Sequence, residues 1–249
     1  MSGDIARVRA GECHVWIAEA VSVPALLPLL DDHERRRHEA FVREKDRALY
    51  LTAHALLRQT VAAQLDGVKP GEVCFAHVCK HCDADRPHGK PAVAGSPLEL
   101  SLSHSGGLVA VALSLAGPVG VDIEETAAGR DLPLNVLSAP ERAALDRVPD
   151  AERPWAFTRY WARKEAVLKA TGDGLMVDPA RLTVSPPDAP AALAEWRERP
   201  EPHLPVRLHD VDAGEGHRAA VAVLGDGECR VVRHEVTHGG DGAVLRRPR

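Results

Sequence analysis

A helical segment followed by short strands occurs twice along this chain, and this order limits the fold more than any other feature. Residues 31–65 carry apolar side chains at helical spacing. Residues 139–170 form a second helical region, interrupted near residues 149–154, that ends at the glycine signal of residues 171–174. Short strands are expected at residues 72–78, 98–103, 108–115, 119–124, 182–185, 205–210 and 219–224. This order predicts an α+β fold.

The recurrence also predicts two similar halves. Lys45–Asp46 lies in the first helical segment and Lys164–Glu165 in the second, and each helix leads into strands. We therefore expect two pseudo-symmetric copies of one α+β unit, residues 1–115 and 116–249, each a small antiparallel sheet packed against helices. An echo of this length also arises by chance in α+β proteins, so both interpretations stay open.

Composition places the chain among folded globular proteins. Of its 249 residues, 45% are hydrophobic and 27% are charged, whereas a disordered chain would be poorer in apolar residues. Two segments are expected to lack regular structure: the proline-rich run of residues 185–202, as a surface loop, and residues 239–249, as a loose tail.

Charge and cysteine content restrict the partners and the compartment. The net charge of -5 gives no general basic field, so we expect no nucleic-acid partner. No segment has the length and apolar content of a signal peptide or a membrane span. Five cysteines, an odd and low number, predict a reducing compartment. We expect a cytoplasmic protein without membrane contact.

Two carboxylates alternate on one short strand. In the sequence GVDIEE, Asp122 and Glu124 are two residues apart, so a strand projects both to the same face. Two oxygen ligands from one strand suit a hard divalent cation such as Mg²⁺. The alternative is a solvated strand end, because an Asp-x-Glu pattern alone is very common.

A helix later in the chain carries further charges among apolar residues. In WARKEAVLKATGDGL, Glu165 and Lys169 are four residues apart and share one helix face. They could form a simple surface ion pair. The flanking Trp161, Val167 and Leu168 argue instead for a buried helix, on which charged groups need partners or a ligand.

Several polar turns are candidates for binding phosphate. Ser103 and His104 end a strand at a glycine turn, where a hydroxyl and an imidazole can donate to an anion, although an ordinary polar turn has the same pattern. A nucleophilic serine is disfavoured because no G-x-S-x-G motif is present. Cys79 and Cys82, with histidines nearby, leave a structural zinc site open, although only one clean cysteine pair exists.

Taken in order, a basic helix, HGKP, LSLSHSG, GVDIE and WARKEAVLKATGDGL resemble the 4′-phosphopantetheinyl transferase superfamily, in its two-domain, monomeric, surfactin-synthetase-activating form. The resemblance covers residues 30–185 and is most specific in GVDIE and W-x-x-K-E-x-x-x-K. It implies a pseudo-twofold α+β monomer with its active site in the cleft between the halves. It also implies transfer of the phosphopantetheine arm of coenzyme A to a serine of an apo carrier protein, with release of 3′,5′-ADP.

The resemblance assigns roles to individual residues. Asp122, Glu124 and Glu165 would hold Mg²⁺. Glu165 would also be the candidate base, directly or through a metal-bound water, and Lys169 the cation that stabilises the leaving group. The candidate coenzyme A contacts are Arg37, Arg47, Gly89, Lys90, Pro91, Ser103 and His104. Leu49 departs from the pattern, because relatives often carry a basic residue there, so Arg47, Arg43 or the arginines at 35–37 must serve instead.

The carrier protein is not decided by the sequence and could belong to a fatty acid, polyketide or peptide synthase. Because the family implies that an acidic carrier helix docks at the cleft, the candidate dock lies near residues 139–145 and includes Arg142. Two rival functions remain: a Mg²⁺-dependent phosphodiesterase or other hydrolase, which would also use three carboxylates, and a non-catalytic carrier-binding module.

Overall fold

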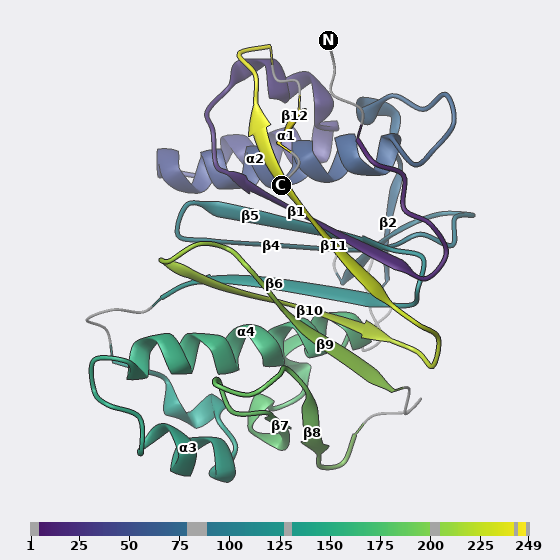
Figure 1. Cartoon of the computed structure of the whole chain (residues 1–249). Helices are drawn as coiled ribbons and strands as arrows, with labels where there is room; N and C mark the ends of the chain where they lie inside the picture. The colour runs from purple at the N-terminus through teal and green to yellow at the C-terminus, as the bar shows by residue number, and fades with distance from the viewer. Residues whose placement is uncertain (1–4, 79–88, 127–130, 200–204, 242–243, 248–249) are drawn as a thin grey trace.

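Two β-sheets face each other, and a long helix covers the outer side of each, as Figure 1 shows. The computed structural model describes residues 5–78, 89–126, 131–199, 205–241 and 244–247. It confirms the predicted α+β class. Among these residues, no helix combines the length and the apolar composition needed to cross a bilayer.

The larger sheet has the strand order β12-β11-β1-β5-β4-β3-β2. Its strands are β1 (Glu12–Glu19), β2 (Phe75–Val78), β3 (Lys90–Val93), β4 (Glu99–Ser105), β5 (Leu108–Ser114), β11 (Arg230–His238) and β12 (Val244–Arg247). Neighbouring strands are antiparallel except for β1 and β11, which are parallel. The helices on this side are α1 (Asp32–Glu39) and α2 (Glu44–Ala62), with the short 3₁₀ turns η1 (Pro24–Leu29) and η2 (Pro70–Glu72).

The smaller sheet has the order β6-β10-β9 and is antiparallel. Its strands are β6 (Val119–Glu125), β9 (Val206–Val211) and β10 (His217–Leu224). The helices α3 (Ala139–Leu145) and α4 (Arg153–Thr171) and a two-stranded sheet of β7 (Leu182–Val184) and β8 (Leu193–Trp196) complete this half, with η3 (Leu134–Val136), η4 (Gly174–Met176) and η5 (Pro179–Arg181) as short turns. The expected glycine signal ends α4, because Gly172 takes a left-handed conformation with φ of 76°.

In the described part of the chain, the core has three apolar layers and a smaller cluster that packs η1 against α2. One lies between α2 and the larger sheet, and one lies between α4 and the smaller sheet. The third lies between the two sheets, where Val15 and Ile17 of β1 pack with Val121 and Ile123 of β6. The period of two therefore buries these residues between the sheets and turns the alternate residues of each strand toward its helix.

The two halves share one arrangement of elements. The order strand, helix, hairpin occurs as β1, α2, β4–β5 and again as β6, α4, β9–β10, and the strand orders β1-β5-β4 and β6-β10-β9 correspond. The similarity between the two short sequences that suggested this repeat was misplaced, however. Lys45–Asp46 lies in the first turn of α2, whereas Lys164–Glu165 lies in the second half of α4.

A buried cation joins the long helix to the short helix before it in each half. In the first half, Arg58 Nε of α2 donates to Glu34 Oε2 at 2.6 Å, and Glu34 caps the start of α1. In the second half, Lys164 Nζ of α4 donates to Glu141, which caps the start of α3. These matching ion pairs are the clearest correspondence between the halves.

Some elements differ from the prediction. The tail at residues 239–249 was expected to be loose, but Val244–Arg247 pairs with β11 as strand β12. The proline-rich run contains β8, which pairs with β7. Strands β1 and β11 were not predicted. Because β11 and β12 extend the larger sheet, this sheet includes both ends of the chain, and the division at residue 115 stays a prediction.

Candidate active site

Four predicted residues meet where α4 crosses β6, below the larger sheet in Figure 1. Asp122 and Glu124 alternate with the buried Val121 and Ile123, so they point to the α4 side of β6. Glu165 and Lys169 lie one turn apart on α4. We call Asp122, Glu124 and Glu165 the carboxylate cluster.

Gly120 allows α4 to lie directly on β6. A Cβ atom at this position would lie 2.1 Å from the Ala166 carbonyl oxygen and 2.3 Å from the Ala170 nitrogen, which is far inside contact distance. The glycine of GVDIE is therefore a packing requirement, and it brings Glu165 and Lys169 close to the strand that carries the other two carboxylates.

Lys169 binds Asp122, the buried carboxylate of the cluster. Its Nζ donates to Asp122 Oδ1 at 2.6 Å and to Ser103 Oγ at 2.9 Å, and Ser103 Oγ in turn donates to Asp122 Oδ1 at 2.8 Å. Asp122 is only 2% exposed. A cation, a hydroxyl and a carboxylate thus lie within one contact, an arrangement that the sequence did not predict.

Glu124 is held by two neutral donors. Ser105 Oγ donates to its Oε2 at 2.7 Å, and the Trp161 indole Nε1 donates to its Oε1 at 3.2 Å. Burial and the nearby charge of Asp122 raise the pKa of Glu124, and these two hydrogen bonds oppose the shift.

Glu165 has the most perturbed carboxylate of the cluster. Burial, together with the negative charges of Asp122 and Glu124, raises its pKa to about 7, and Lys169 only partly offsets this. A carboxylate with a pKa near 7 takes up and releases protons around neutral pH, which is the property that a general base needs.

The donor set fits a divalent cation. Within the described ranges, no three His, Cys, Asp or Glu side chains are arranged so that they could hold a metal ion as they stand. However, the buried oxygens Asp122 Oδ2 and Glu165 Oε1 have no hydrogen-bond partner among the described residues. Buried acceptors without donors are costly, and hard cations such as Mg²⁺ prefer carboxylate oxygens. The residues present therefore fit Mg²⁺.

Lys90 lies at the end of α4, and His104 lies close enough to Lys169 to be affected by its charge. Lys90 Nζ donates to Glu99 Oε2 at 2.7 Å and to the Ala170 carbonyl oxygen at 3.4 Å, which places it at the end of α4 beside Lys169. His104 reaches solvent, and desolvation by its surroundings, then the charges of Lys169 and His54, lower its pKa.

The other predicted coenzyme A contacts lie on other elements of the fold. Gly89 is exposed with φ of 96°, and Pro91 pairs with His77 between β3 and β2. Arg37 lies over the ring of Tyr50, whereas Arg47 donates to the Phe41 carbonyl oxygen at 2.8 Å. Within the described part of the chain, no hydrogen bond or ion pair joins either arginine to the carboxylate cluster, so their role stays a prediction.

Three features of the site were missed from the sequence. Ser105 and the indole N–H of Trp161 orient Glu124, and Gly120 sets the approach of α4. Signals were present: Ser105 lies two residues after Ser103 in the same strand, and a glycine within a strand often marks close backbone approach. The zinc site that the sequence left open is not tested, because Cys79 and Cys82 lie outside the described residues. Cys74 is an exposed free cysteine.

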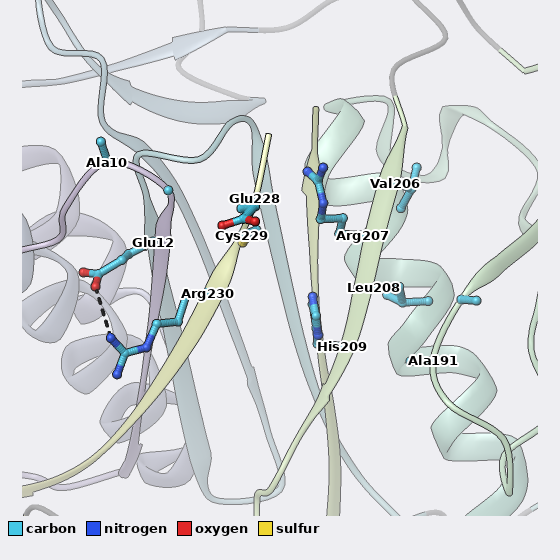
Figure 2. A pocket seen from close by; sticks show the side chains of 12 residues that line it. Ala10, Glu12, Ala191, Val206, Arg207, Leu208, His209, Glu228, Cys229 and Arg230 are labelled. Carbon is cyan, nitrogen blue, oxygen red and sulfur yellow. Dashed lines mark ion pairs between the residues drawn. The ribbon is translucent and has the colours of Figure 1, made fainter. Parts of the chain in front are cut away.

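A separate groove lies at the edge of the smaller sheet (Figure 2). It has a volume of about 720 Å³, and the residues that line it include Arg207 and His209 of β9, Cys229, and the ion pair between Arg230 and Glu12. None of the residues of the carboxylate cluster lines this groove.

Comparison with known proteins places the site in a family context. The model of the 4′-phosphopantetheinyl transferase superfamily matches residues 118–222, which contain β6, α4 and the whole carboxylate cluster. The 4′-phosphopantetheinyl transferase HetI of Nostoc sp. is 30% identical over 179 residues, which cover 65% of this chain and 72% of that protein.

Two further relatives match a shorter part of the chain. AcpT of Salmonella typhi, also a 4′-phosphopantetheinyl transferase, is 46% identical over 92 residues, or 34% of this chain and 46% of that protein. The 4′-phosphopantetheinyl transferase psf-1 of Bacillus pumilus is 39% identical over 95 residues, or 35% of this chain and 38% of that protein. The chain therefore matches less than half the length of these two relatives.

Proposed function

The chain belongs to the 4′-phosphopantetheinyl transferase superfamily, and from this premise we propose that its carboxylate cluster is the centre at which the transfer takes place. The enzyme transfers the phosphopantetheine arm of coenzyme A to a carrier protein. The observation that carries the assignment is the meeting of three carboxylates, of which Glu124 and Glu165 have raised pKa values, with one lysine where α4 lies on β6.

We propose that Asp122, Glu124 and Glu165 hold Mg²⁺. The two buried oxygens without donors, Asp122 Oδ2 and Glu165 Oε1, support this assignment, because they would gain a partner. When bound, Mg²⁺ would supply positive charge to the pyrophosphate of coenzyme A, where negative charge builds up during phosphoryl transfer.

Glu165 is proposed as the acceptor of the proton from the carrier serine. In the metal-free protein, burial and the charges of Asp122 and Glu124 raise its pKa to about 7. A bound Mg²⁺ would lower this pKa again, so the carboxylate would be ionised and able to accept a proton. A serine hydroxyl that loses its proton to Glu165 can attack the phosphorus atom that carries the phosphopantetheine arm.

Lys169 is proposed to stabilise the leaving 3′,5′-ADP. Its ammonium group already lies at the cluster, bound to Asp122 and Ser103, so it can donate to a phosphate oxygen with little movement. Lys90, at the end of α4, and His104 of β4 are proposed to bind the phosphates of coenzyme A. Arg37, Arg47, Gly89 and Pro91 stay proposed contacts on the nucleotide side.

The proposed partner is an apo carrier protein of a fatty acid, polyketide or peptide synthase, docked near α3. Arg142 is exposed on this helix and can meet an acidic carrier surface. That the enzyme acts as a cytoplasmic monomer is also a proposal.

The test is to incubate the protein with coenzyme A, Mg²⁺ and several apo carrier proteins, and to measure the carrier mass. We expect a carrier that gains one phosphopantetheine arm, and loss of this product by several orders of magnitude in Asp122→Ala and Glu124→Ala. If either variant keeps more than about a tenth of the activity, the metal assignment is wrong. Cleavage of coenzyme A without a carrier would indicate a hydrolase, and carrier binding without modification would indicate a binding module.

A further inference from the structure

Three serines of β4 meet β6 across the junction between the two sheets. Ser101, Ser103 and Ser105 alternate along β4, so their side chains lie on one face of the strand. We call them the serine ladder. Their hydroxyl groups contact β6 at Val121 N (3.0 Å), Asp122 Oδ1 (2.8 Å) and Glu124 Oε2 (2.7 Å), respectively.

The ladder completes an otherwise open strand edge. β6 is an edge strand of the smaller sheet and pairs there only with β10. On its other edge, the Ser101 hydroxyl accepts from Val121 N, and the Ser105 hydroxyl accepts from Glu125 N at 3.1 Å. Side-chain hydroxyls thus provide the acceptors that a neighbouring strand would offer, and they fix β6 relative to β4.

Ser105 differs from Ser101 because it contacts both the backbone and a carboxylate. Its oxygen accepts from Glu125 N, which leaves its one O–H free to donate to Glu124 Oε2. The Trp161 indole donates to the other oxygen of Glu124. Each oxygen of this carboxylate therefore receives one donor, from β4 and from α4 respectively, and the two donors define the plane of the carboxylate.

We propose that Ser105 is a positioning residue that orients Glu124 for binding the metal, with Trp161 as the second support. This inference depends on the proposed function, because Glu124 must be a metal ligand. Hydrogen-bond partners of metal ligands commonly change metal affinity by about 10- to 100-fold when they are removed. The ladder also makes the position of Glu124 depend on the junction between the two halves.

The test measures binding of Mn²⁺ to the full-length protein by electron paramagnetic resonance, with coenzyme A present and no carrier protein. Ser105→Ala should weaken Mn²⁺ binding about tenfold. Ser105→Thr keeps the hydroxyl and should stay within about twofold of the native affinity. Trp161→Phe removes the N–H donor together with the five-membered ring of the indole and should also weaken binding.

Ser101→Ala is the matched control. It makes the same chemical change on the same strand, but Ser101 contacts only the backbone of β6, so the variant should lower the melting temperature while leaving the Mn²⁺ affinity within about twofold. Equal weakening in Ser101→Ala and Ser105→Ala would show a general loosening of the junction and overturn the proposal. Native Mn²⁺ affinity in Ser105→Ala would overturn it as well.

Two further variants keep the result decisive. If Ser105→Ala does not fold, native Mn²⁺ affinity in Trp161→Phe refutes a positioning requirement at Glu124, and weakened affinity supports it. Glu124→Ala separates this inference from the proposed function. If Glu124→Ala binds Mn²⁺ normally, Glu124 is not a ligand and both proposals fail, whereas loss of binding in Glu124→Ala with native binding in Ser105→Ala refutes the positioning role alone.

Discussion

Replacing Gly120 by alanine tests whether the close contact of α4 with β6 builds the site. The added Cβ would meet the backbone of α4 at 2.1 Å and 2.3 Å, and atoms need separations of roughly 3.5 Å, so the helix must move by about 1 Å. Because a helix backbone cannot rotate away as a side chain can, we expect destabilisation near the upper end of overpacking effects, about 3 kcal/mol. In a domain of this size, that lowers the melting temperature by roughly 10 °C.

The same movement displaces Glu165 and Lys169 from β6. A misplacement of about 1 Å commonly costs about 100-fold in rate, so we expect kcat to fall by this factor in the fraction that remains folded. Urea unfolding and carrier modification measured below the melting temperature separate the two effects. Gly227→Ala is the control, because no atom lies within 4 Å of its added Cβ, and it should change the free energy of unfolding by less than about 0.5 kcal/mol. A Gly120→Ala protein with native stability and native kcat would refute the packing argument.

Three further predictions concern charged groups. Lys169→Met should lower kcat by about 100- to 1,000-fold with little change in the Mg²⁺ concentration that the enzyme requires. Glu165→Gln should raise the required Mg²⁺ concentration. An equal shift of this concentration in both variants would show that Glu165 is not a ligand. Burial would raise the pKa of Glu34, but hydrogen bonds from His54 and Arg58 outweigh this effect and lower the pKa to about 2. The ionised Glu34 carboxylate therefore stabilises the fold by about 3 kcal/mol above pH 4.5, and this contribution is lost as the pH falls toward 2. The difference in unfolding free energy between the native protein and Glu34→Gln should therefore shrink by about 2 kcal/mol between pH 6 and pH 3, and a constant difference would contradict the linkage. Arg142→Glu should raise the KM for the carrier and leave the KM for coenzyme A unchanged; unchanged carrier kinetics would exclude α3 as the dock.

The parts of the fold that could be predicted are those whose partners lie nearby in the sequence. The β4–β5 hairpin and the helices α2 and α4 follow from local periodicity and glycine turns. β11 and β12 could not be found in this way, because β11 pairs with β1 at the opposite end of the chain. Its sequence, RVVRHEVTH, also mixes charged and apolar residues, so its burial depends on a sheet that forms only in the folded protein.

The same distinction between local and distant partners holds for the candidate site. Asp122 and Glu124 share a face by strand period, and Glu165 and Lys169 share a face by helix period, so each pair was predictable from its own element. The contacts of Ser105 with Glu124 cross between two different sheets, and no local pattern specifies how two sheets meet. The sequence therefore predicted the charged groups that come together in the cluster, but not the groups that hold them.

The pseudo-symmetry shows why the three carboxylates of the cluster all come from one half. When the paired residues of β1 and β6 are taken in order, Trp16 stands where β6 has Asp122, and Ala18 stands where β6 has Glu124. Trp16 and Ala18 pack against α2 in the core, on the face that corresponds to the α4 face of β6.

The helices follow the same correspondence. Arg58 and Lys164 are the matching buried cations, and the residue after each is Gln59 in α2 and Glu165 in α4. One framework of strand, helix and hairpin thus forms an apolar core in the first half and a charged cluster in the second. Burying three carboxylates with one lysine is unfavourable unless a cation compensates them, whereas the first half gains stability from the same positions through apolar packing. The stability of the first half can therefore offset the cost of the charged cluster in the second half.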